Sequence, residues 1–104
     1  MFGIEQLINF MENKFGVAVE LNEVGKETVL LYHEELDEEL ISEDVLRILP
    51  NPVSFHIYIY NAKSEWIIGI ALEANTNNPL FLVCLKDGVR VYEKLLNEGE
   101  SKNG

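Results

Sequence analysis

The sequence predicts an α+β protein with two helices packed on an antiparallel sheet of about five strands, the last four forming a meander. Two observations predict this class. Apolar residues recur at helical spacing over 4–15, and from residue 53 onward they alternate with polar residues as in strands. The 104 residues have the size of one domain, which we expect to span 1–96, followed by a disordered tail at 97–104.

The first helix is expected over residues 4–15. Its apolar face comprises Ile4, Leu7, Ile8, Met11 and Phe15. Glu5 lies in the first turn and Lys14 in the last, where the helix dipole favours acidic and basic side chains respectively. Gly16 follows directly and is the expected C-terminal cap.

A hairpin is the interpretation for residues 17–33. Val17, Val19 and Leu21 alternate with other residues and predict a half-buried strand. A turn containing Gly25 is expected over 22–27, and a second β-rich run covers 28–33.

A second, acidic helix is expected within residues 34–49. Ile41, Val45, Ile48 and Leu49 would share its apolar face, and Ser42 could cap a fresh helical start. The pattern leaves open whether 35–40 belongs to this helix or forms a separate turn. Pro50 ends the helix.

Four further strands follow. They are expected at 53–60, 66–72, 80–85 and 89–96, and the pattern also allows a helical end to the last run. The run at 66–72 is apolar almost throughout, which is typical of a central strand covered on both faces. Asp87-Gly88 is a strong signal for a tight hairpin turn between the last two strands.

The net charge of −10 is concentrated in one part of the chain. Residues 20–44 carry ten acidic side chains and one basic side chain, hence −9, and all other residues together carry −1. Such a field attracts basic protein surfaces and repels nucleic acid and anionic membranes. We therefore expect a protein partner with a basic nucleic-acid-binding surface; a merely solubilising acidic face is the alternative. The candidate partner-binding acids are Glu20, Glu23, Glu34, Glu35, Asp37, Glu38, Glu39, Glu43 and Asp44.

Catalytic motifs are missing from the sequence. It contains no glycine-rich phosphate loop, nucleophile elbow or zincin motif. His33 and His56 lack the spacing of metal ligands, and Cys84 lies in an apolar strand where a small buried side chain is expected. We therefore expect neither a catalytic residue nor a metal or other cofactor, and we expect that the protein is not an enzyme.

The cellular setting is expected to be the cytoplasm. A single cysteine provides no disulfide framework, which favours a reducing compartment. The N-terminal residues do not resemble a signal peptide, and no run approaches the roughly 20 apolar residues of a membrane span.

Element order and charge placement together resemble the phage-encoded uracil-DNA glycosylase inhibitors. That family has a helix, a strand, an acidic helix and an antiparallel meander, and it mimics the DNA backbone to occupy the enzyme's DNA-binding groove. The resemblance implies that Glu20 or Glu23 is the first-strand acid and that Glu43 and Asp44 are acids of the second helix. It also implies an apolar pocket that grips a protruding enzyme side chain, lined here by Val45, Leu49, Ile57, Ile68 and Ile70.

Three functions remain open from the sequence. The first is an acidic inhibitor that occludes the nucleic-acid-binding site of an enzyme, such as a glycosylase inhibitor or another phage anti-defence protein, for example an inhibitor of a CRISPR nuclease. The second is an immunity protein or antitoxin that neutralises a basic toxin. The third is an adaptor, or a domain that dimerises through a strand edge; the chain is thus expected to be a monomer or a homodimer.

Overall fold

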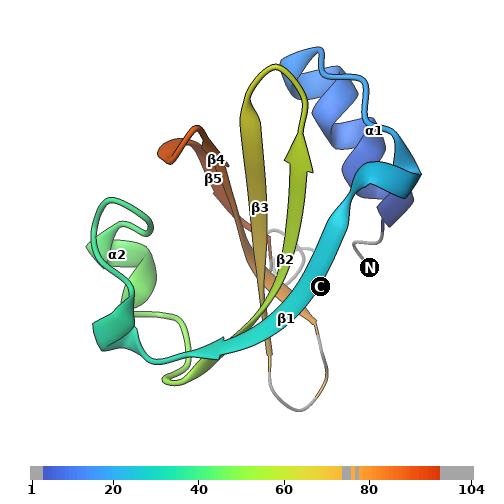
Figure 1. Ribbon diagram of the computed structural model, residues 1–104. Coiled ribbons are helices and arrows are strands. Elements are labelled where there is room, and N and C mark those ends of the chain that lie inside the picture. Colours follow the sequence, from blue (N-terminus) through green and yellow to red (C-terminus); the bar gives the residue numbers. More distant parts are fainter. Residues whose placement is uncertain (1–3, 74–75, 77, 97–104) are drawn as a thin grey trace.

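The structure is a computed structural model, and it describes residues 4–73, 76 and 78–96. Its regular elements begin with α1 (Ile4–Phe15), β1 (Gly25–Leu31) and α2 (Glu43–Leu46). They continue with β2 (Val53–Asn61), β3 (Glu65–Leu72), β4 (Pro79–Lys86) and β5 (Val89–Leu95). The five strands lie in sequence order in one antiparallel sheet, so the α+β class and the meander are confirmed (Figure 1). The tail expected at 97–104 lies outside the described residues.

One face of the sheet is covered by α1. Leu7 and Met11 are buried on this helix, each with 1% of its surface exposed. They pack in a cluster with the side chains of β2, β3 and β4 that point to this face, namely Tyr58, Tyr60, Trp66, Ile68, Ile70, Leu72, Leu82 and Cys84. Gly16 ends the helix with φ 69° and donates its N–H to the Glu12 carbonyl, as expected of a C-terminal cap.

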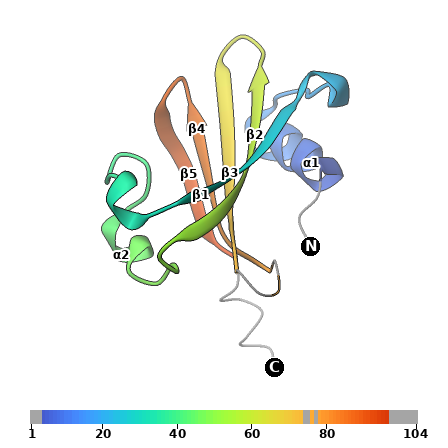
Figure 2. The same cartoon turned by 60° about the horizontal axis from the view of Figure 1, so that its bottom comes forward.

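The opposite face is covered by α2 and by the irregular chain that precedes it. Leu36, Ile41, Val45 and Leu49 are buried in this layer. They form a second cluster with Val53, Phe55, Ala71, Phe81 and Val83 of the sheet. Figures 1 and 2 show α1 and α2 on opposite sides of the sheet, so the sheet is the middle of three layers.

The strand expected at 17–21 is wrong. Val17 and Val19 do pack against the cluster under α1, which explains the alternating pattern, but none of the described strands pairs with them. The Tyr60 hydroxyl instead donates a hydrogen bond of 2.9 Å to the Ala18 carbonyl. The first strand of the sheet is therefore β1, which contains only part of the second run of the expected hairpin.

The second helix is much shorter than expected. Within 34–49 the α-helix is confined to Glu43–Leu46, and Ser42 precedes it in an extended conformation. A 3-10 turn, η2 (His33–Glu35), lies upstream, and Leu40 and Ile41 donate their N–H groups to the Asp37 carbonyl. The dense like charge of this stretch opposes a long helix, because acids three and four residues apart repel on one face.

The meander agrees closely with the sequence. Its four strands lie within a residue or two of the expected ranges. Asp87 (φ 52°) and Gly88 (φ 84°) both adopt positive φ, as the tight hairpin turn requires. The Asp87 carboxylate also accepts a hydrogen bond of 2.9 Å from the Glu65 N–H, which ties this turn to β3.

Candidate functional site

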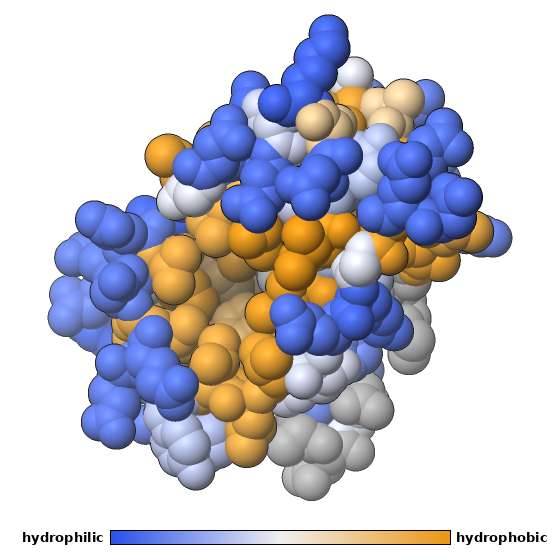
Figure 3. Space-filling view, in the orientation of Figure 1, coloured by the Kyte–Doolittle hydropathy of each residue, from blue (hydrophilic) through white to orange (hydrophobic). Residues whose placement is uncertain are grey.

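An apolar cavity lies between the sheet and the chain that precedes α2. Its volume is about 90 Å³. The lining is apolar and comprises Leu31, Leu36, Leu40, Ile41, Phe55, Ile57, Ile67, Gly69, Val83 and Leu85. Figure 3 shows it as an apolar hollow in the surface with hydrophilic residues on its margins. An open cavity of this kind can accept an apolar group about the size of an aliphatic side chain.

The floor of the cavity is set by strand register. Ile57 on β2 pairs with Gly69 on β3, and Gly69 pairs with Val83 on β4, so these three residues share one face. Gly69 has no side chain to fill the space. A Cβ built there would lie 3.4 Å from Phe55 Cδ1 and 3.4 Å from Val83 Cγ1.

One wall of the cavity is also the most acidic part of the molecule. We call residues 33–44 the acidic segment. Leu36, Leu40 and Ile41 line the cavity, while the intervening residues Asp37, Glu38 and Glu39 are exposed. The other acids of the segment, Glu34, Glu35, Glu43 and Asp44, are exposed as well. The segment thus contributes apolar side chains inward and carboxylates outward.

The remaining predicted acids lie at the other end of β1. Glu20 and Glu23 are exposed at η1 (Leu21–Glu23), between α1 and β1, so Glu20 is not on a strand. Between the two acidic groups runs β1 itself (Figure 1). It carries the exposed Glu27, which pairs with Ile57 of the cavity lining. Carboxylates therefore follow the edge of the sheet past the cavity. Glu27 was not among the predicted site residues, although it belongs to the same acidic stretch of sequence.

Few of these carboxylates are neutralised within the molecule. Of the ten acids in 20–44, Asp44 is the one that makes an ion pair within the described part of the chain, 3.7 Å from Arg47. Both side chains of that pair are largely exposed, and such pairs contribute about 0–1 kcal/mol. Glu35 Oε2 accepts a hydrogen bond of 3.2 Å from the Tyr32 N–H, and the other carboxylates are exposed and can meet cations of a partner.

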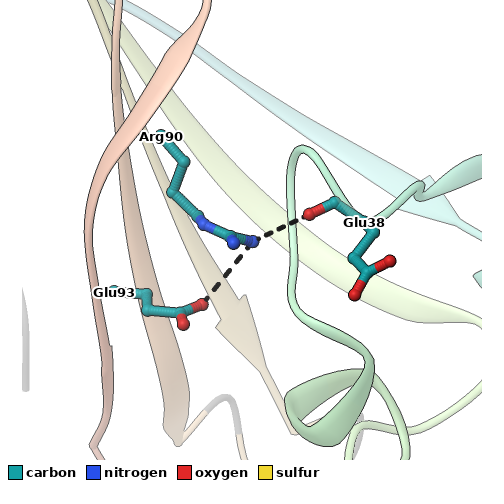
Figure 4. Close-up of polar contacts among 3 residues, drawn as sticks. All are labelled: Glu38, Arg90 and Glu93. Carbon is teal, nitrogen blue, oxygen red and sulfur yellow. Dashed lines mark hydrogen bonds and ion pairs between the residues drawn. The ribbon is translucent and has the colours of Figure 1, made fainter.

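Arg90 on β5 reaches across to the acidic segment. Its Nη1 donates a hydrogen bond of 3.1 Å to the carbonyl oxygen of Glu38 and lies 3.9 Å from Glu93 Oε1 (Figure 4). This contact joins the far edge of the sheet to the wall of the cavity. Sequence reasoning missed Arg90, because a lone base on an edge strand gives no local signal of a partner 52 residues away.

The predicted pocket residues divide between the two faces. Ile57 lines the cavity, and Val45 and Leu49 are buried in the same layer without lining it. The placement of Ile68 and Ile70 in this pocket is wrong, because both point to the α1 face and are buried there. Side chains alternate along β3, so the face that contains Gly69 cannot contain its two neighbours.

The remaining candidates for chemistry do not converge. His33 Nε2 lies 2.7 Å from the Pro50 carbonyl oxygen, whereas His56 pairs with Thr28 and Ile70 in the sheet. Cys84 is buried in the α1-side cluster as expected, and burial raises the pKa of its thiol from 9.0 to about 12. Among the described residues no group of three or more metal-ligating side chains could hold a metal ion. None of the described helices has the length and apolar character needed to cross a membrane.

No protein-family model, curated protein or solved structure matches this chain. Functional inference therefore rests on the geometry and charge of the surface around the cavity.

Proposed function

We propose that this chain is an acidic cytoplasmic protein that inhibits a nucleic-acid-processing enzyme by occupying its nucleic-acid-binding surface. The observation that carries the proposal is the combination of exposed carboxylates with an apolar cavity in one surface. A solubilising acidic face would not need an open apolar cavity in its middle, since exposed apolar surface lowers solubility.

The acids supply the likeness to nucleic acid. Enzymes that act on DNA or RNA hold the backbone with Lys and Arg side chains, whose charge is normally matched by phosphates. Carboxylates along β1 and the acidic segment offer the same charge to those cations. Their attraction would speed association and would weaken as salt screens it.

The cavity supplies the part of the interaction that is independent of charge. Burial of one aliphatic side chain contributes about 1.5–3 kcal/mol. A partner with a protruding Leu, Ile or Met beside its basic surface would fill the space between Leu40 and Gly69. Charge alone would bind many basic proteins, so this contact provides selectivity.

A capture experiment tests the proposal for the whole class of partners. The purified protein is immobilised and exposed to a bacterial lysate at low and at high salt, and bound proteins are identified by mass spectrometry. Recovery of one nucleic-acid-processing enzyme, with less retained at high salt, is the expected result. Recovery of a small basic toxin would favour the immunity function instead, and retention of no specific protein at either salt would overturn the proposal.

A direct assay tests the enzyme that the resemblance names. Purified uracil-DNA glycosylase is incubated with the protein and then given a uracil-containing oligonucleotide. Inhibition that is relieved by excess substrate DNA is the expected result, because the two would compete for one surface. Undiminished glycosylase activity at a large molar excess of the protein would exclude this target.

A further inference from the structure

We infer that Arg90 is a positioning residue, which holds the acidic segment in its binding geometry while leaving the carboxylates of that segment free. The inference deepens the proposed function and rests on it for the effect on binding. The effect on the segment itself can be measured without any partner.

The acidic segment has little structure of its own to fix it in place. Beyond η2 and the start of α2, its internal hydrogen bonds link residues three or four apart, as in Leu40 and Ile41 to Asp37. Its seven carboxylates repel one another, which favours more extended conformations. Leu36 and Ile41 anchor it by burial, but they lie beside a cavity and not in a fully filled core.

The hydrogen bond from Arg90 to the Glu38 carbonyl joins the acidic segment to the sheet. Across the described residues, it is the one hydrogen bond that joins residues 36–42 to the sheet. His33 makes the tie at the start of the segment, through its N–H to Asn51 Oδ1 at 3.0 Å and its ring to Pro50. Arg90 therefore holds the middle of the segment, next to the cavity wall formed by Leu36 and Leu40.

The acceptor that Arg90 uses matters for function. A guanidinium among so many acids would ordinarily pair with a carboxylate of the segment and neutralise it. Figure 4 shows Arg90 directed to the backbone oxygen of Glu38, while the Glu38 carboxylate points away. The segment is thus held through its backbone, and its charge stays available to a partner.

Glu93 keeps the guanidinium in this position. It lies on β5, with its Oε1 3.9 Å from Arg90 Nη1. The Glu93 side chain is 33% exposed and the Arg90 side chain 26%. Glu93 Oε1 is buried and has no hydrogen-bond partner among the described residues, so its charge depends on Arg90. Arg90 is therefore held between a carboxylate on its own strand and a carbonyl on the segment.

Two variants separate positioning from charge. Arg90→Ala and Arg47→Ala each remove one positive charge, and Arg47 is an exposed residue just beyond the same segment. If charge alone mattered, both changes would make the protein a slightly better ligand for a basic surface. If Arg90 positions the segment, Arg90→Ala binds less well, because the segment must be ordered during binding.

The first measurement is amide hydrogen exchange of the free protein. We expect the Leu40 and Ile41 amides to exchange about tenfold faster in Arg90→Ala than in Arg47→Ala, with β2 to β4 unchanged. Arg90→Lys should lie between, because it keeps the charge but not the planar donor group. Equal exchange in Arg90→Ala and Arg47→Ala would overturn the positioning role.

The second measurement is inhibition of uracil-DNA glycosylase. We expect Arg90→Ala to inhibit about tenfold less well than Arg47→Ala. Arg90→Ala with Glu93→Gln should behave the same, which excludes an effect of the stranded Glu93 charge. Equal inhibition by Arg90→Ala and Arg47→Ala would overturn the role in binding. A wild-type protein that does not inhibit would refute this enzyme as target, while hydrogen exchange would still decide the positioning role.

Discussion

Gly69 on β3 lies directly opposite Ile57 on β2, and the missing side chain at Gly69 keeps the floor of the apolar cavity open. Both residues belong to the central part of the sheet, so the cavity is built into the most regular portion of the fold. This makes it possible to fill the cavity without changing any charge.

Filling the floor should separate stability from binding. Gly69→Ala adds a Cβ at ordinary contact distance and removes the backbone freedom of glycine, so we expect the free energy of unfolding to rise by about 0.5–1 kcal/mol. Gly69→Val occupies more of the cavity, and we expect it to inhibit a partner enzyme at least roughly tenfold less well. Denaturant unfolding and the glycosylase assay measure the two effects; equal inhibition by both variants and the wild type would rule out the cavity as a contact.

The loss of inhibition on neutralising acidic residues should depend on where those residues lie and not on how many are changed. One triple variant changes the acidic segment: Glu34→Gln, Asp37→Asn and Glu38→Gln. Its control changes three exposed acids elsewhere: Glu5→Gln, Glu12→Gln and Glu73→Gln. We expect roughly tenfold to hundredfold weaker inhibition, with a smaller salt dependence, from the first variant only. If the two triple variants lose the same affinity, net charge and not the acidic surface explains binding.

The hydroxyl of Tyr60 should contribute measurably to stability. It donates to the Ala18 carbonyl at 2.9 Å and fixes the chain between α1 and β1 against the sheet. Tyr60→Phe removes this bond and strands the carbonyl, which should cost about 1 kcal/mol. Urea unfolding, followed by the fluorescence of the single tryptophan, Trp66, provides the measurement. An unchanged midpoint would show that water replaces the hydroxyl without cost.

Cys84 should make stability fall at alkaline pH. Its thiol has a pKa of about 12 in the folded protein and 9.0 when not buried, so the unfolded chain ionises first. The contribution is therefore fully present below pH 9 and is lost as pH rises toward 12, by about 1.4 kcal/mol per pH unit. The free energy of unfolding is measured against pH for the wild type and for Cys84→Ala. The difference between the two profiles isolates this effect from the titration of Lys and Tyr side chains. If the two profiles stayed parallel above pH 9, the expected contribution of Cys84 would be contradicted.

The meander and its turns could be predicted because their signals are local. The register was available too: a turn centred on Lys63 pairs Ile57 with Gly69, which places Ile68 and Ile70 on the other face. The assignment of those two isoleucines to the pocket ignored that constraint. Strand alternation, applied across the hairpin, was sufficient to correct it.

Other features depend on contacts that no local pattern encodes. Residues 17–21 alternate and residues 28–33 are rich in β-forming side chains, and only pairing with β2 decides that the first strand lies at 25–31. The acidic segment has helix-forming residues, but its path follows from the burial of Leu36 and Ile41 and from the distant Arg90. Tertiary contacts override weak local preference at these positions.

The two layers that cover the sheet differ in how freely they can change during evolution. A single helix packed on eight buried residues of the sheet holds the α1 side, and altering it would threaten folding. The opposite cover is mostly irregular chain, and such chain tolerates insertions, deletions and exchanged surface residues at little cost in stability. A lineage of such proteins could follow a partner that changes its surface by exchanging the exposed residues of 33–44, while the buried Leu36 and Ile41, the sheet and the first helix stay as they are.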